Sequence, residues 1–203
     1  MDDLTREEFL RLLNLKSTTL DQRVHKNEMV FFPGLSRPAA IGDYSALDGL
    51  YGLTSSMLNG CAKIELKDAA DLTRTNWEDL AKGFAKVERQ METDGLIFFA
   101  VATVFGDDGK VKKISGAVGT GQQASNVLQS AGKHASLYML PLYIVLRTLR
   151  NCAKQAKPQI QLPTYLIPAA PDTPEFETWL AWVREYRRRA ILKHKAKKAK
   201  AEA

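Results

Sequence analysis

The segment Leu15-Lys16-Ser17-Thr18-Thr19-Leu20-Asp21-Gln22-Arg23-Val24-His25-Lys26 decides the fold of the amino-terminal part of the chain. Leu20 and Val24 are four positions apart, so on a helix they form a single inward stripe. Ser17 is the predicted N-cap, because a serine hydroxyl accepts a hydrogen bond from an amide that is otherwise unpaired at a helix start. The spacing therefore predicts a helix from Ser17 that turns its polar side chains outward.

The outward residues of this helix carry hydroxyl, amide and cationic groups, which read base edges and hold phosphates in a DNA major groove. The predicted base-edge contacts are Thr18, Thr19, Gln22 and Arg23, with Ser17 at the start of the same surface. The predicted phosphate contacts are Lys16, His25, Lys26 and Arg37. The alternative is that these side chains form an ordinary solvated helix face.

A first helix is predicted over Thr5 to Leu13, immediately before this segment. Thr5 and Glu8 have the spacing of a capping box. Asn14-Leu15-Lys16 provides a short polar break, and Asn27 tolerates the left-handed conformation that ends the second helix. Two helices joined by so short a break predict a helix-turn-helix.

A hairpin is predicted after the second helix. Met29-Val30-Phe31-Phe32 has the composition of a strand, Pro33-Gly34 is a turn signal, and Ala39-Ala40-Ile41 supplies a returning strand. Such a hairpin would be the wing of a winged helix, with Arg37 near its tip. The alternative role of Arg37 is that of a solvated loop cation.

A third helix is predicted from Ser45, with Ser45 as the cap, Asp48 as its capping-box partner and an end near Asn59-Gly60. With this start in place, residues 4–58 resemble the winged helix-turn-helix of MerR-type regulators and phage excisionases. The resemblance rests on three motifs in order: Ser17-Thr18-Thr19-Leu20, Met29-Val30-Phe31-Phe32-Pro33 and Tyr44-Ser45-Ala46-Leu47-Asp48. It implies DNA binding.

The chain departs from that family pattern in two places. MerR-type wings usually carry Gly-Tyr-Arg before the conserved tyrosine, whereas this chain has Ala40-Ile41-Gly42, so Arg37 is the candidate substitute for the wing arginine. The pattern after the third helix also differs from the long dimerising helix of MerR regulators. The resemblance therefore implies no metal or drug sensing.

The net charge of +6 belongs to the carboxyl end of the chain. Positions 184–203 hold nine Lys and Arg against two Glu, which leaves 20 basic and 21 acidic residues in positions 1–183. The predicted basic tail, residues 193–203, adds non-specific DNA affinity through counterion release or serves only for solubility. Up to Gly42, six basic and six acidic residues cancel.

Cys61 and Cys152 match no metal-ligand spacing and fit a reducing cytosol as small buried thiols. The acidic start Met1-Asp2-Asp3 does not have the composition of a signal peptide, and the longest apolar run, 137–149, is too short to span a bilayer. These features predict a cytoplasmic protein that does not contact a membrane.

The remaining chain is predicted as a mixed domain. Thr75 is the expected cap of an amphipathic helix reaching Met91, whose apolar face is a core surface or a dimer seam. The run from Gly95 to Phe105 predicts a buried strand. Asp107-Asp108-Gly109 and Val111 to Val118 predict a turn and a returning strand.

Four further features follow along the chain. The glycine-rich stretch Gly116–Gly121 is either a flexible turn or a phosphate cradle, although it matches no nucleotide-binding fingerprint. A buried helix is expected over Ala135 to Lys154, with Pro141 kinking it or starting its main part.

An edge strand is expected over 159–167, followed by a linker. A last helix starts with Thr173-Pro174-Glu175 and buries the stripe Phe176, Trp179, Leu180, Val183 and Tyr186.

The predicted organisation is α+β, with a winged helix-turn-helix over 1–60, a linker over 61–75, a self-association or sensor domain over 76–192 and the tail over 193–203. No catalytic or metal-ligand motif and no cofactor fingerprint is recognised, so no enzyme activity is expected. The function expected is that of a dimeric repressor that binds double-stranded DNA in the nucleoid, with a small-molecule or protein effector left open. The alternatives are an excisionase-like DNA-bending protein and a winged-helix module that binds protein or ligand.

Overall fold

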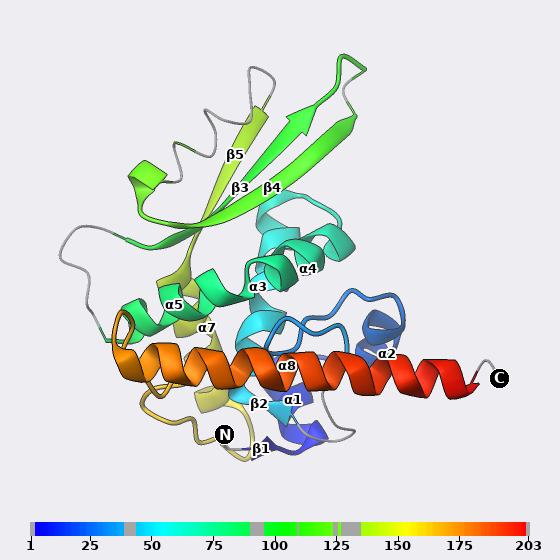
Figure 1. The fold of residues 1–203 in the computed structure, drawn as a ribbon, viewed down its shortest axis with the longest axis vertical. Coiled ribbons are helices and arrows are strands. Elements are labelled where there is room, and N and C mark those ends of the chain that lie inside the picture. Colours follow the sequence, from blue (N-terminus) through cyan, green and yellow to red (C-terminus); the bar gives the residue numbers. More distant parts are fainter. Residues whose placement is uncertain are drawn as a thin grey trace.

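The computed structural model describes residues 3–38, 44–89, 96–108, 110–123, 126 and 135–201. The chain is mixed α+β: a three-stranded antiparallel sheet stands on a body of helices, and a long last helix crosses that body (Figure 1). The strands are β1 (Asp3–Leu4), β2 (Tyr44–Ser45), β3 (Phe98–Phe105), β4 (Val111–Gly119) and β5 (Ala135–Pro141). The helices are α1 (Arg6–Leu12), α2 (Ser17–His25), α3 (Ala46–Ala62), α4 (Leu66–Thr75), α5 (Trp77–Glu88), α7 (Leu142–Gln155) and α8 (Pro174–Ala201).

Helices α1 and α3 begin at the capping boxes that the sequence predicts. The Thr5 hydroxyl accepts from the Glu8 amide while the Glu8 carboxylate accepts from the Thr5 amide, and Ser45 and Asp48 repeat this exchange. The short strands β1 and β2 pair just before the two helices, and the Phe9 ring stacks on the Tyr44 ring at 4.5 Å. α3 runs beyond Asn59-Gly60 and ends at Ala62, with Lys63 left-handed.

The predicted strand over 29–32 is wrong, because this segment is a buried loop closed by a single bridge. The amides and carbonyls of Phe31 and Leu35 exchange hydrogen bonds of 2.9 and 2.7 Å around the Pro33-Gly34 turn. Met29, Val30, Phe31, Phe32 and Leu35 are all buried. Gly34 has a φ of +68°, and a Cβ there would lie 2.8 Å from the Arg74 carbonyl oxygen. The proposed returning strand, 39–41, lies outside the described residues.

The buried carboxylate of Asp48 fixes this loop onto α3. One carboxylate oxygen accepts from the Phe32 amide at 2.6 Å, and the other accepts from the Ser45 amide at 2.6 Å and from the Ser45 hydroxyl at 2.9 Å. Asp48 therefore caps α3 and holds a segment 16 residues earlier in the chain. Because the Phe32 amide is bound to Asp48, it is not available to pair with a second strand. The segment 29–35 therefore does not form the two-stranded hairpin of a wing.

Residues 61–75 are helical rather than a linker. They comprise the end of α3, a break of three residues and the whole of α4, and Thr75 is the last residue of α4 instead of the cap of α5. The cap position of α5 is Asn76, which makes no side-chain capping bond. Cys61, expected to be buried, is exposed, and Cys152 is half-buried.

The apolar face of α5 packs inside its own molecule. Trp77, Leu80, Ala81 and Phe84 are buried, and Tyr51 of α3 donates a 2.6 Å hydrogen bond to the Trp77 carbonyl. The core interpretation of this helix is therefore confirmed. The same face is not available as a dimer seam.

The sheet has the strand order β4-β3-β5. The predicted buried strand and its returning partner are confirmed as β3 and β4. The glycines Gly116 and Gly119 lie within β4, so the Gly116–Gly121 stretch does not form the strand-to-helix phosphate loop that was considered. The predicted helix over 135–154 is half wrong: 135–141 is strand β5, paired with β3, and Pro141 is the residue at which α7 starts.

The segment between α7 and α8 contains no strand, contrary to the prediction for 159–167, and is held instead by a buried ion pair. The Glu88 side chain is fully buried and accepts from Arg150 Nη2 at 3.0 Å. It also accepts from the amides of Leu166 and Ile167 at 2.9 and 3.1 Å. These side-chain contacts replace the ladder that a strand would have used.

The last helix is longer than predicted. Thr173 caps it as expected, accepting from the Phe176 amide at 3.2 Å, but the helix continues to Ala201 through the segment interpreted as a frayed tail. Phe176, Leu180 and Val183 are buried, and the Trp179 ring stacks on Phe32 at 5.9 Å. Tyr186 is exposed instead of buried, because it lies on the outer side of α8.

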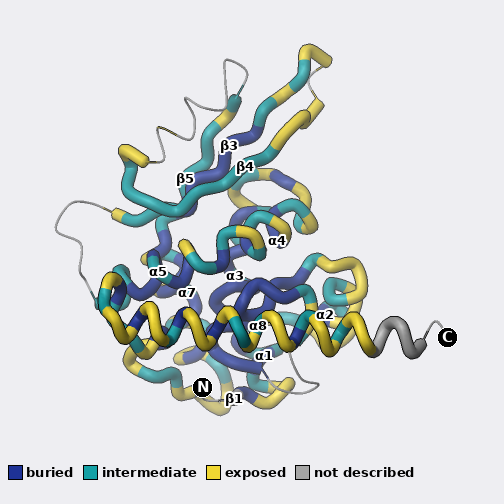
Figure 2. Tube along the Cα trace, viewed as in Figure 1, coloured by how far each residue is buried: buried dark blue, intermediate teal, exposed yellow. Residues whose placement is uncertain are grey.

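One hydrophobic core joins the two predicted domains. Its buried residues run from Leu4 in the amino-terminal strand to Ala190 in α8, and Figure 2 shows them as a continuous dark interior from α1 to the foot of the sheet. The boundaries expected near residues 60 and 75 therefore do not separate two cores. None of the helices in the described part of the chain is both long and apolar enough to cross a membrane.

Replacing Asp48 should weaken the fold more than replacing an exposed cap. Asp48→Ala leaves the Phe32 amide and the Ser45 donors without their acceptor, at a cost of about 2–4 kcal/mol in the free energy of unfolding. Thr5→Ala removes the exposed capping box of α1 and should cost about 1 kcal/mol. Urea unfolding followed by circular dichroism measures both. Equal losses in the two variants would contradict the anchoring role of Asp48.

Replacing Glu88 should loosen the segment before α8. Glu88→Ala leaves the buried amides of Leu166 and Ile167 without their acceptor and removes the carboxylate partner of Arg150, which still donates to the carbonyls of Pro163 and Thr164. The expected cost is about 2–3 kcal/mol in the free energy of unfolding. The local opening should appear as faster proteolysis within 163–167 and as loss of amide-exchange protection at Leu166 and Ile167. The control is Glu7→Ala on the exposed side of α1. Unchanged protection in the Glu88 variant would rule out the proposed anchor.

Candidate nucleic-acid interface

The turn between α1 and α2 forms as the sequence predicts. Asn14 has a φ of 50°, and the Leu15 amide donates to the Leu10 carbonyl at 2.9 Å, which closes the end of α1. Leu15 is half-buried and packs against the core. The short break therefore fixes the relative placement of α1 and α2.

Helix α2 is anchored through one stripe and exposed on the other side. Leu20 is 1% exposed, and Val24 packs against the core from its edge. The predicted contact residues that are fully exposed are Lys16, Ser17, Thr18, Gln22, His25 and Lys26, whereas Thr19 and Arg23 are half-buried. The structure thus brings most of the predicted surface together on one helix face.

The predicted cap of α2 is wrong by one residue. Lys16 occupies the N-cap position without a side-chain bond, and Ser17 is the first helical residue. The Ser17 hydroxyl accepts from Arg6 Nη2 at 3.1 Å, and the same guanidinium nitrogen lies 2.6 Å from Asp21. Arg6 therefore links α1 to α2 and compensates the one carboxylate within α2.

Arg23 is partly committed to the protein itself. Its Nη1 donates to the hydroxyl of Ser56 in α3 at 3.3 Å. This contact joins α2 to α3. Arg23 is therefore better placed to position α2 than to read a base edge.

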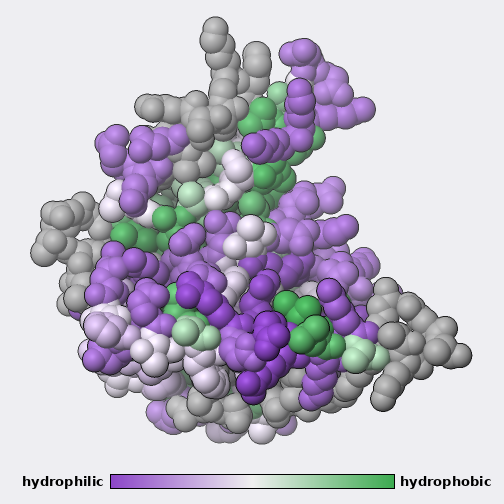
Figure 3. All heavy atoms as spheres, viewed as in Figure 1, coloured by the Kyte–Doolittle hydropathy of each residue, from purple (hydrophilic) through white to green (hydrophobic). Residues whose placement is uncertain are grey.

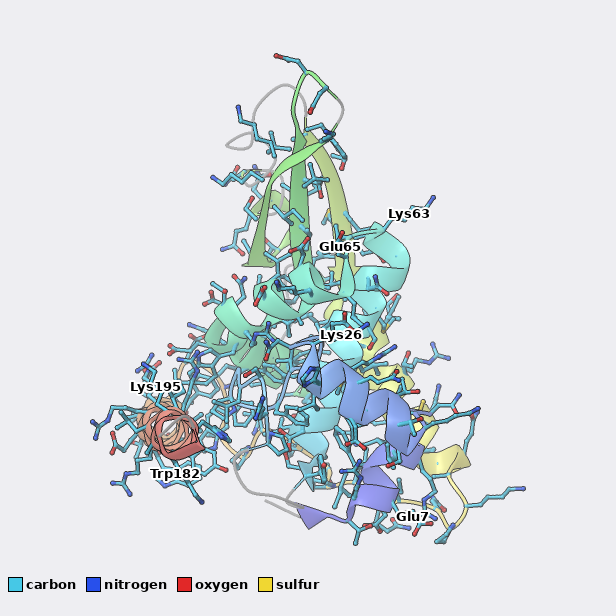
Figure 4. All side chains as sticks on the ribbon, turned by 90° about the vertical axis from the view of Figure 1, so that its right-hand side faces the viewer. Glu7, Lys26, Lys63, Glu65, Trp182 and Lys195 are labelled. Carbon is cyan, nitrogen blue, oxygen red and sulfur yellow. The ribbon has the colours of Figure 1, made fainter. Side chains whose placement is uncertain are left out.

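Arg37 is exposed, but not at the tip of a wing. It follows the buried 29–35 loop and lines a groove of about 870 Å³ together with α4 and the carboxyl-terminal part of α8. Asn27, which ends α2 with a φ of 57° as predicted, lines the same groove. The exposed end of α2 is thus continuous with this groove, and Figure 4 shows Lys26 of α2 and Lys195 of α8 on the face turned to the viewer.

The contribution of α8 to this surface is the feature that the sequence interpretation missed. The residues from Lys193 onward were treated as a separate tail, whereas their helix brings His194 and Lys195 beside Arg37. A signal was present, because alanine and lysine are good helix formers and no glycine or proline follows Pro174. Hydrophilic side chains dominate the visible surface of α8 (Figure 3).

Among the described residues, no three His, Cys, Asp or Glu side chains gather into a group that could hold a metal ion. The chain was also compared with protein families, curated proteins and solved structures, and none of them matched it.

Proposed function

We propose that the chain is a sequence-specific DNA-binding transcriptional regulator that inserts α2 into the major groove. The observation that carries this proposal is the two-sided character of α2: Leu20 is buried while Thr18 and Gln22 are exposed in front of it. Hydroxyl and amide groups exchange hydrogen bonds with base edges, and glutamine pairs with adenine through two of them. An exposed helix tied to its neighbours, here by Arg6 of α1 and by the Arg23–Ser56 contact with α3, is the element that such proteins place in the groove.

The charge around α2 supports the same proposal. Lys16, His25 and Lys26 are exposed at the two ends of the helix, where phosphates would lie if its centre faced the bases. Asp21, which would repel phosphate, is paired with Arg6. In this proposal Thr18 and Gln22 read bases, Thr19 lies at the edge of the contact, and Arg23 positions the helix through Ser56.

We further propose that the protein acts as a homodimeric repressor in the nucleoid. One reading helix covers only a half-site, and dimers place two such helices about one DNA turn apart. Repression needs only occupancy of a promoter. Since the apolar face of α5 is buried in its own core, the dimer contact has to involve another surface.

Selection from random 30-base-pair duplexes tests this proposal. The expected result is an enriched sequence arranged as an inverted repeat with half-sites about 10 base pairs apart. Recovery of one bent half-site would favour the excisionase-like alternative. If no sequence is enriched while the protein is folded, DNA reading by α2 is wrong, and the protein-binding or ligand-binding alternative is favoured.

Removing the base-reading groups should abolish sequence preference without unfolding the protein. For Thr18→Ala/Gln22→Ala we expect the ratio of selected to random DNA affinity to fall by on the order of 10-fold or more, since each good base contact discriminates by about 1–3 kcal/mol. Fluorescence anisotropy at fixed salt measures both affinities. The matched control is Thr164→Ala/Gln161→Ala, which changes the same residue types on an exposed loop elsewhere. A similar loss in the control would contradict the assignment.

A further inference from the structure

We infer that the groove between the loop after α2, helix α4 and the end of α8 binds the sugar-phosphate backbone of duplex DNA beside the site that α2 contacts. This inference rests on the proposed function and adds a second contact to it. The groove measures about 870 Å³, and its cationic lining comes from Arg37, Lys67, Arg74 and Lys195. These residues lie on three segments that are distant in the sequence.

The charge of the groove is unbalanced in favour of cations. Asp71 is the acidic residue in its lining, and it is paired with Arg74, whose guanidinium also donates to the carbonyls of Asn27 and Met29. Arg37, Lys67 and Lys195 are exposed, and none of them forms an ion pair with an acidic residue in the described ranges. Three exposed cations beside one carboxylate that is already paired suit a polyanion.

The wall that α8 contributes contains an unsatisfied polar atom. Nε2 of His194 is buried and has no hydrogen-bond partner among the residues that the structure describes. Buried polar atoms in folded proteins nearly always have a partner. His194 also lines the groove beside Lys195.

Three arginines in the middle of α8 already form ion pairs within the protein. Arg184 forms a bidentate contact with Glu78 at 3.0 and 2.6 Å. Arg188 and Arg189 both donate to Glu185, and these hydrogen bonds lower the pKa of Glu185 to about 2. The ion pairs leave the part of α8 beyond Ala190 as its DNA-facing part, and that part is the one beside Arg37.

The position of the groove favours duplex DNA over a small anion. Asn27 follows Lys26, so the groove begins where the exposed face of α2 ends. A duplex read by α2 carries phosphates past that end at one charge per about 1.7 Å of helix axis.

The test removes two groove cations that lie outside α2. For Lys67→Ala/Lys195→Ala we expect about 10-fold weaker binding at 0.15 M salt to both selected and random 30-base-pair duplexes. The plot of log affinity against log salt concentration should become less steep by about 2, since each lost phosphate contact reduces the magnitude of its negative slope by about 0.9. The matched control is Lys112→Ala/Lys113→Ala on β4, which removes the same charge from exposed positions on the sheet.

A change confined to the groove variant supports the inference, and equal changes in both variants overturn it. A groove variant that binds DNA like the wild type also overturns it. If that variant still prefers the selected sequence over random DNA, the proposed function stands without the groove contact. A small-anion site would be indicated instead if pyrophosphate at millimolar concentration raised the melting temperature of the wild type but not of the groove variant, with DNA affinity unaltered. If the wild type bound selected and random DNA equally well, the proposed sequence-specific function would be contradicted, while the groove could still contact phosphates.

Discussion

The buried carboxylate of Asp48 is the constraint on which the amino-terminal part of the molecule depends. It accepts a hydrogen bond from the Ser45 amide at the start of α3 and another from the amide of Phe32. A charged acceptor inside the protein is stable only when donors surround it, so α3 and the 29–35 loop form together. That loop then supplies Phe32 to the Trp179 ring and Gly34 to the Trp77 side chain. The placement of α8 thus follows from a contact made near the other end of the chain.

The loop that Asp48 holds also explains why α1, α2 and α3 share one core with the rest of the chain. In an independent winged domain the segment after the second helix would project outward. Here its apolar side chains turn inward and meet α5 and α8. The consequence is that the exposed face of α2 is supported by residues from both ends of the sequence. Changes in the carboxyl-terminal half can therefore alter the orientation of α2 without touching it.

Sequence reasoning succeeded where the signal was local. The capping boxes at Thr5 and Ser45, and the Leu20–Val24 stripe, depend on residues three or four positions apart. It failed where distant pairing decides the outcome: 135–141 is apolar enough for a helix or a strand, and only β3 makes it a strand. The groove beside α2 could not be predicted, because residues near 37, 67 and 195 share no local pattern. The strand predicted over 29–32 did not form, because the Phe32 amide donates to Asp48, 16 residues away, instead of to a neighbouring strand.

The unbroken course of α8 has a thermodynamic meaning. A helix of 28 residues is about 42 Å long, and its backbone loses little further freedom when one end meets a partner. Charges on a disordered segment would have to be ordered on association, at about 1–2 kcal/mol for each residue fixed. Lysines carried on a rigid rod avoid most of that entropic loss. In the proposed complex with DNA, the spacing of Lys193 and Lys195 along α8 is fixed before the two molecules meet.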